Sequence, residues 1–105
     1  MIEVTMNYRI LPNADVAAYE ETMRRAVGLA LEAKGIEQIS AHRDLLNPAH
    51  VLSTSVWDST SDWAAFVERP EWQAIVGEMR HHVADLHVDV WAVSPVVPSP
   101  LRPRH

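Results

Sequence analysis

The stretch IEQISAHRDLLNPAHVLSTSVW, residues 36–57, decides the fold because it holds two alternating runs on either side of a turn. In residues 36–43 and again in residues 51–57, apolar and polar side chains follow one another with the period of two that is typical of a half-buried strand. Between these runs, the pair Asn47-Pro48 is typical of a turn. The stretch therefore predicts a β-hairpin.

The chain before the hairpin predicts a strand followed by a helix. Residues 2–10 alternate in the same way as the hairpin strands, which predicts the first strand. Asn13 or Asp15 can cap a following helix, and Gly35 is expected to end it. Apolar residues at spacings of three and four form one stripe of this helix: Val16, Tyr19, Met23, Ala26, Val27 and Ala30.

The chain after the hairpin predicts a bent helical element and a last strand. Ser59 or Ser61 can cap a short helix that runs through Phe66, and Pro70 is suited to the first turn of a longer helix. Residues 87–93 alternate again, which predicts the fourth strand. One face of the longer helix is expected to carry Trp72, Ile75, Val76, Met79, Val83 and Leu86.

The order strand, helix, strand, strand, helix, strand is the split βαβ arrangement of ferredoxin-like α+β domains. It predicts a four-stranded antiparallel sheet with both helical elements on one face and the other face open, so we expect a homodimer formed through that face. Residues 1–93 are predicted to form this single domain. Residues 94–105 contain four prolines and are predicted to form an extended C-terminal arm.

Composition and charge exclude several classes of function. The formal net charge of -5 supplies no basic stripe, so binding to nucleic acid or to an anionic membrane is not expected. The chain has no cysteine, and its first residues lack the pattern of a signal peptide. No apolar run approaches the length that spans a membrane. A cytoplasmic protein is the expectation.

The segment from Val56 to Phe66, VWDSTSDWAAF, followed by Arg69-Pro70-Glu71-Trp72, resembles the antibiotic biosynthesis monooxygenase (ABM) family. In that family the third strand ends in a Trp-Glu-Ser-like signature, and Asp58 stands in for the acid. Similar features recur at Leu11-Pro12, at Gly35 and in the hairpin RDLLNP, so the resemblance covers roughly residues 1–93. It implies a dimeric α+β barrel with one pocket per subunit between sheet and helices.

The resemblance points to Trp57 and Trp63 as an aromatic catalytic pair. Members that oxidise aromatic polyketides use a Trp at the first position and a phenol near the second, where this chain has Trp63. An indole N–H donates a hydrogen bond but has no phenolic proton to exchange. Both rings can hold a flat substrate, or they can simply fill the core.

Ser53 and Asn7 are the polar candidates beside this pair. Ser53 stands where the same oxygenases have an Asn, four residues before Trp57 and on the same strand face. Asn7 is the alternative amide and the third catalytic candidate. It either serves the site or belongs to a polar row, with Thr5 and Arg9, that faces solvent or a dimer partner.

Three more residues are candidates for binding substrate, namely Phe66, Trp72 and His82. His82 falls on the edge of the predicted helix stripe, so it either reaches the pocket or stays solvated. Haem-degrading members of the family need an axial His roughly where this chain has Ile75, which cannot bind iron.

Neither a metal nor an organic cofactor is predicted. His42, His50, His82 and His87 do not show a metal-binding spacing, and the adjacent His81 and His82 point about 100° apart on a helix. The three glycines are not grouped into a phosphate-binding loop.

Two functions from different classes remain as hypotheses. The first is a cofactor-independent monooxygenase that oxidises a small aromatic substrate such as a phenol, a quinol or a polyketide. The second is a non-catalytic dimeric protein that binds a small ligand or assists a pathway enzyme. A haem-degrading monooxygenase is a third and weaker possibility.

Overall fold

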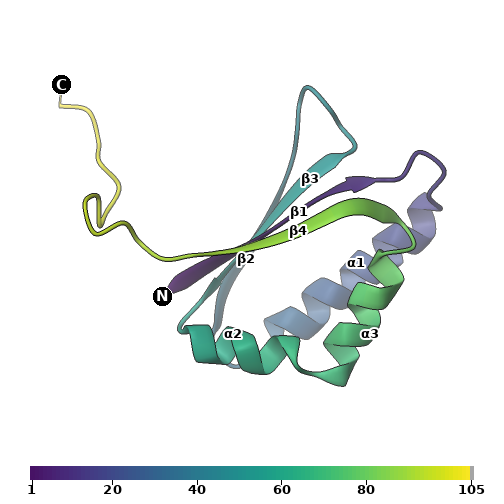
Figure 1. The fold of residues 1–105 in the computed structure, drawn as a ribbon, viewed down its shortest axis with the longest axis horizontal. Helices are drawn as coiled ribbons and strands as arrows, with labels where there is room; N and C mark the ends of the chain where they lie inside the picture. The colour runs from purple at the N-terminus through teal and green to yellow at the C-terminus, as the bar shows by residue number, and fades with distance from the viewer. Residues whose placement is uncertain (105) are drawn as a thin grey trace.

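The computed structural model describes residues 1–104 and has one four-stranded antiparallel sheet in the order β2-β3-β1-β4. All three helices lie on one side of this sheet, and no helix of the described residues lies on the other side (Figure 1). The predicted ferredoxin-like α+β fold is confirmed, with two helices in the second helical element. Along the chain the elements are β1 Ile2–Ile10, α1 Val16–Leu31, β2 Ile36–Arg43, β3 His50–Trp57, α2 Thr60–Val67, α3 Pro70–Met79 and β4 Val83–Trp91.

Strand register divides the central strands into two faces. Val4 of β1 pairs with Ser55 of β3, and Met6 pairs with Ser53, so these four side chains share the face that the helices cover. The alternate residues of β1, including Asn7, lie on the opposite face, which we call the open face. The period-two pattern of residues 2–10 therefore becomes two surfaces with different chemistry.

Local capping sets where the helices begin. The side chain of Asp15 accepts a hydrogen bond from the Ala18 N–H at 3.1 Å, and the hydroxyl of Ser59 accepts one from the Asp62 N–H at 3.1 Å. These side chains satisfy N–H groups that the first helical turn leaves unpaired. Of the two caps considered for each helix, the structure selects Asp15 for α1 and Ser59 for α2.

Gly35 lies in the connection between α1 and β2, and it does not end the first helix as the sequence predicts, because α1 already ends at Leu31 with Glu32 as its C-cap. The φ of 89° at Gly35 lies in the left-handed region, which glycine adopts without steric cost. A Cβ at this position would also collide with the side chain of Asp62 in α2. The residue is therefore required both by its backbone conformation and by a close approach of two elements.

The boundary between α3 and β4 corrects the sequence prediction. The helix ends at Met79 instead of extending to Leu86, and β4 begins at Val83 rather than at residue 87 and ends at Trp91. The cause is an irregularity in β4, where two residues lie opposite a single residue of β1 and Asp85 has a φ of 57°. Because of the extra residue, Val83 and Leu86 pack in the same cluster although they are three positions apart in a strand. Apolar residues at this spacing on one side are what a helix would show in the sequence.

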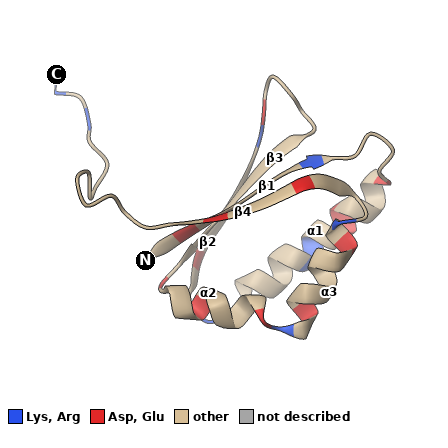
Figure 2. Cartoon of the chain, viewed as in Figure 1, with Lys and Arg blue, Asp and Glu red and all other residues tan. Residues whose placement is uncertain are grey.

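The buried core falls into two clusters beneath the sheet. One contains Trp57 and Phe66 together with Ile2, Val4 and Ala30, and the other contains Tyr8, Met79 and Val83. Beyond Trp91 the described chain has no helix or strand, and residues 94–104 run away from the body (Figure 1). Residues of both charges are scattered along the sheet and the helices (Figure 2).

Candidate functional site

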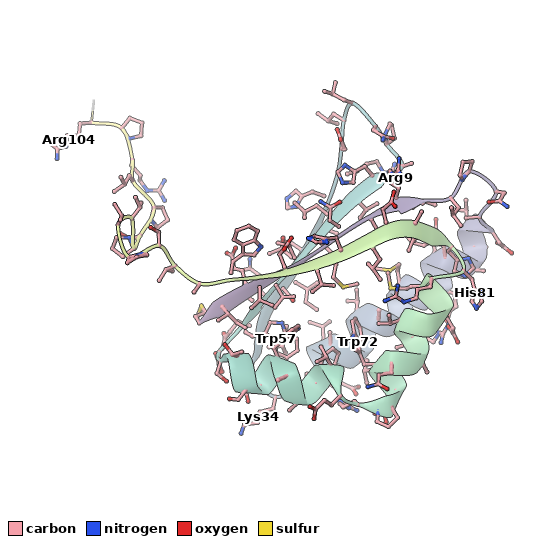
Figure 3. All side chains as sticks on the ribbon, in the orientation of Figure 1. Arg9, Lys34, Trp57, Trp72, His81 and Arg104 are labelled. Atoms are coloured by element: carbon pink, nitrogen blue, oxygen red, sulfur yellow. The ribbon has the colours of Figure 1, made fainter. Side chains whose placement is uncertain are left out.

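A cavity of about 540 Å³ lies between the covered face of the sheet and the helices. Its walls come from β1, β3, β4 and β2 on one side and from all three helices on the other. Figure 3 shows the rings of Trp57 and Trp72 on the helix side of the sheet, whereas Arg9 lies on the other side. The volume falls in the range of small-molecule sites, so the cavity is the candidate functional site.

Aromatic rings form one wall of the cavity. The ring centroids of Trp57 and Phe66 are 5.2 Å apart, and those of Phe66 and Trp72 are 4.8 Å apart, both in tilted arrangements. Trp63 of α2 also lines this wall. Only 2% of Trp57 and 4% of Phe66 is exposed, so the wall is preformed and rigid. Trp63 and Trp72 are only half-buried, so they present the flat apolar surface of this wall to the cavity.

The indole of Trp57 already has a hydrogen-bond partner inside the protein. Its Nε1–H donates to the hydroxyl oxygen of Ser55 at 2.9 Å, and Ser55 in turn donates to the carbonyl oxygen of Val4 at 3.5 Å. The chain Trp57–Ser55–Val4 fixes the ring plane, because rotation would leave a buried N–H unpaired. Trp57 is therefore a fixed and almost fully buried part of the cavity wall.

Tyr8 and three methionines line the end of the cavity that is formed by the core cluster of Tyr8, Met79 and Val83. The hydroxyls of Tyr8 and Tyr19 are 2.7 Å apart, and Tyr8 also approaches the Met23 Sδ at 3.7 Å. Burial raises the pKa of Tyr8 well above its usual range, and the hydrogen bond with Tyr19 acts in the same direction. Tyr8 therefore stays neutral and cannot act as a base. The methionines are Met6, Met23 and Met79.

The polar groups of the cavity are few. Ser53 and Ser55 lie on the sheet side, Gln73 lies in α3, and Arg80 lies two turns further on at the C-cap of that helix. Among the described residues that line the cavity, Arg80 is the only one with a charged side chain, and it is exposed. A single cation beside an otherwise apolar cavity favours a ligand that carries a negative charge or develops one.

The structure brings together most of the residues singled out from the sequence. Ser53, Trp57, Trp63, Phe66 and Trp72 all line the cavity. Tyr8, Gln73 and Arg80 also line the cavity, although they were not predicted from the sequence. Strand alternation places Tyr8 with Val4, and the spacing of 73 and 80 puts both residues on one helix face, so these patterns were the available signals.

Asn7 and His82 lie outside the cavity. Asn7 is on the open face, where its side-chain oxygen and the His50 Nε2 are 2.5 Å apart, and the other ring nitrogen of His50 is 3.2 Å from an Asp44 carboxylate oxygen. His82 lies in the turn after α3, and its carbonyl oxygen accepts a hydrogen bond from the Leu11 N–H at 2.9 Å. The strand parity of Asn7 and the early end of α3 explain both placements.

The sequence profile of the antibiotic biosynthesis monooxygenase family matches residues 1–78, about three quarters of the chain. The chain belongs to this family. A search of the curated protein sequences finds no matching relative. The family match covers β1 to α3 almost to its end, and thus most of the elements that build the cavity.

Solved structures with the same fold include members of this ABM family. SnoaB, a cofactor-independent oxygenase from Streptomyces nogalater, superimposes with a TM-score of 0.79 over 93% of this chain and 97% of its own, at 10% identity. A structure named antibiotic biosynthesis monooxygenase has a TM-score of 0.79 over 90% and 100%, at 17% identity. A conserved protein from Methanosarcina mazei has a TM-score of 0.78 over 86% and 89%, at 12% identity. These similarities establish the shared fold.

Residues 1–104 of this ABM family member contain no group of three or more His, Asp or Glu side chains placed to hold a metal ion. Ile75 is buried in α3 with 7% of its surface exposed, and it has no atom that could ligate iron. Within the same residues, no helix is both long enough and apolar enough to span a membrane. That the protein works without a metal or cofactor stays a prediction.

Proposed function

We propose that this protein is a cofactor-independent monooxygenase that oxidises a small aromatic substrate of the phenol, quinol or polyketide type with O₂. The observation that carries the proposal is the cavity itself, an aromatic and methionine-lined space with one exposed cation, Arg80, on its wall. Membership of the ABM family supports the same reaction class. The similarity to SnoaB, itself a cofactor-independent oxygenase, agrees with it.

The reaction begins when the substrate transfers a proton to solvent water, which leaves a phenolate or enolate, and the peroxide formed later takes a proton back from solvent. This electron-rich anion reduces O₂ and forms a carbon–oxygen bond, which yields a peroxide at that carbon. When a CH₂ group is oxidised, the peroxide then loses water and leaves a carbonyl. One oxygen atom enters the product, the other leaves as water, and the substrate supplies all the electrons.

The residues of the chain contribute by binding, charge and exclusion of water. Trp63 and Trp72, the two half-buried rings of the wall, hold the substrate ring, and the apolar lining keeps water away from the anion. Arg80 stabilises the negative charge and so lowers the pKa of the bound substrate. Ser53 is placed to donate a hydrogen bond to a substrate oxygen. Tyr8 is held neutral and does not take up the substrate's proton, and Arg80 is the charged group of the lining that stabilises the anion.

Oxygen uptake with a panel of anthrones and hydroquinones tests the proposal. We expect uptake above the buffer rate, with one O₂ consumed for each product and no free hydrogen peroxide. Replacing the cavity cation in Arg80→Met is expected to lower kcat/KM by about tenfold or more, because one charge-stabilising contact in the transition state is lost. Arg102→Met, which removes a cation from the exposed C-terminal arm, is the matched control and leaves the rate unchanged. Uptake equal to that of buffer would contradict the proposal.

A non-catalytic ligand-binding protein is the second candidate, and the internal hydrogen bonds favour it. The Trp57 N–H and the Tyr8 hydroxyl are both occupied by protein partners, so neither is free for chemistry. A binder would raise the Tm in proportion to the logarithm of ligand concentration, without consuming oxygen. Stabilisation by an aromatic ligand with no turnover therefore selects this function. Haem degradation is not proposed, because no histidine lines the described cavity.

The homodimer predicted from the sequence is retained as part of the proposal. On the open face, Leu52 and Trp91 are 37% and 55% exposed, and a lone subunit of this size buries only a modest share of its surface. Packing two copies through this face would bury both residues while leaving the cavity, on the other side of the sheet, accessible. The net charge of -5 argues against nucleic acid as a further partner.

A further inference from the structure

A glycine interrupts the cavity-facing side of α3. Gly77 lies in the last turn of this ten-residue helix, before the C-cap Arg80, where glycine still destabilises the helical state relative to alanine because it has more backbone freedom to lose. Such a residue in a helix calls for a compensating reason, either in the backbone, in the packing or in the function.

Neither the backbone nor the packing supplies that reason. Among the described residues, Gly35 is the one glycine with a positive φ, so Gly77 has no conformation that a side chain would strain. A Cβ built on Gly77 meets no atom within 4 Å, whereas a Cβ on Gly35 would collide with Asp62. Gly35 is thus required by the fold, and Gly77 is not.

Gly77 does have a distinctive place in the wall of the cavity. It is exposed and lines the cavity, with Gln73 one turn before it and Arg80 one turn after it on the same helix face. Val27 of α1 and Val88 of β4 also line the cavity, and they are 38% and 45% exposed. These five residues mark the mouth, and the missing side chain leaves a slot in it between an amide and a guanidinium.

We propose that Gly77 determines how wide a ligand the cavity accepts. The slot lets the outer edge of a flat fused-ring ligand pass α3 while its inner ring rests on the aromatic wall. Gln73 and Arg80 flank that edge, so oxygen substituents on the outer ring find a hydrogen-bond donor on each side. This inference rests on the proposed function in one respect, namely that the ligand is aromatic.

Gly28 provides a matched control for the experiment. It also lies inside a helix, α1, it is exposed, and a Cβ built on it meets no atom within 4 Å. Unlike Gly77, it is not part of the cavity lining. Substitution of either glycine by alanine is therefore expected to raise the Tm by a similar amount, because both remove the same backbone freedom.

The experiment measures the Kd of phenol, 2-naphthol and 2-hydroxyanthracene by calorimetry. The proteins are the wild type, Gly77→Ala, Gly77→Leu and Gly28→Leu, with the fold of each variant checked by circular dichroism and thermal unfolding. In Gly77→Leu we expect the Kd of the three-ring probe to rise about tenfold or more, while that of phenol changes by less than about twofold. Gly77→Ala shifts the Kd of the three-ring probe in the same direction by a smaller factor, and Gly28→Leu shifts none.

If Gly77→Leu weakens all three probes equally, or weakens none, Gly77 does not select ligand width. If Gly28→Leu reproduces the effect, the cause is helix stability rather than the slot. If the wild type binds the three probes and Gly77→Leu weakens the three-ring probe alone, but no oxygen is consumed, only the monooxygenase proposal is overturned. The role of Gly77 then stands. Failure of the wild type to bind any of the three probes would overturn both.

Discussion

The two faces of the sheet come from the same strands yet differ in chemistry. On the covered face, β1 and β3 contribute Val4, Tyr8 and Trp57, which are at most 4% exposed and surround an apolar cavity. On the open face, the same two strands contribute Asn7 and His50, whose side chains are hydrogen-bonded to each other. His50 also contacts the carboxylate of Asp44, which lies outside the sheet. One face can exclude water from a ligand, and the other is suited to water or to a second protein surface.

The difference shows that strand parity assigns a residue's role more firmly than its chemical type does. Asn7 is an amide of the kind that an oxygenase site uses, but it is one residue away from Tyr8 and therefore points to the opposite side. Ser53, a weaker hydrogen-bonding group, has the parity that places it in the cavity. The predictions below test how far the two faces differ.

The largest effect is expected from removing a ring of the covered face. Trp57→Ala should lower the free energy of unfolding by about 3–5 kcal/mol, because it leaves a void and removes the N–H that donates a hydrogen bond to the Ser55 hydroxyl oxygen. The comparison is Trp91→Ala on the open face, expected to cost about 1 kcal/mol through loss of its hydrogen bond to Thr5. Urea unfolding at low protein concentration measures both, and equal losses would show that the faces do not differ in burial.

A charge on the open face should act on assembly instead. In Leu52→Asp, two introduced carboxylates would be buried near each other in a dimer formed through this face, so the dimer Kd should rise about a hundredfold. Leu45→Asp, in the hairpin loop at 94% exposure, is the control and should not change it. Sedimentation over a range of concentrations gives the Kd, and an unchanged value in Leu52→Asp would place any dimer contact elsewhere.

The covered face should also make the protein sensitive to alkali. Burial raises the pKa of Tyr8 above its usual value of 10.0, so the unfolded chain loses this proton at a lower pH than the folded chain does. Stability is therefore complete below about pH 10 and falls as the pH rises further, by up to about 1.4 kcal/mol per pH unit. Tyr8→Phe should remove this part of the slope in urea unfolding curves. An identical alkaline loss in the variant would mean that Tyr8 ionises freely.

The smallest effect is expected at Asn7. Asn7→Ala loses the contact with His50 on the open face, which should cost about 1 kcal/mol or less, and it should leave ligand Kd and oxygen uptake unchanged. Ser53→Ala, from the covered face, should instead weaken ligand binding about threefold or more. A larger loss of oxygen uptake in Asn7→Ala than in Ser53→Ala would mean that the reaction takes place on the open face and not in the cavity.

Much of the fold could be predicted because the signals are local. Alternation in residues 2–10 and 36–57 identified three strands, and side-chain caps such as Asp15 and Ser59 marked helix starts. The start of β4 could not be read in the same way. Its extra residue changes the alternation at Asp85, and such an irregularity depends on the partner strand β1 rather than on the segment itself.

The candidate site was predictable in part for a related reason. The aromatic residues around Trp57 belong to one continuous segment of sequence, and that segment carried the family resemblance. Arg80 and Gly77 have no such signal, because each becomes part of the site only when α3 folds onto the covered side of the sheet and lines the cavity.

The sequence by itself determined the order of the elements, the two kinds of strand face and membership of the ABM family. Only the tertiary structure decided which face holds the cavity, that Asn7 and His82 lie outside it, and that Arg80 and Gly77 stand at its mouth. The physical reason is that periodicity and capping act between residues close together in the chain. A cavity, in contrast, is the space left between elements that are distant in sequence, and its lining depends on how they pack.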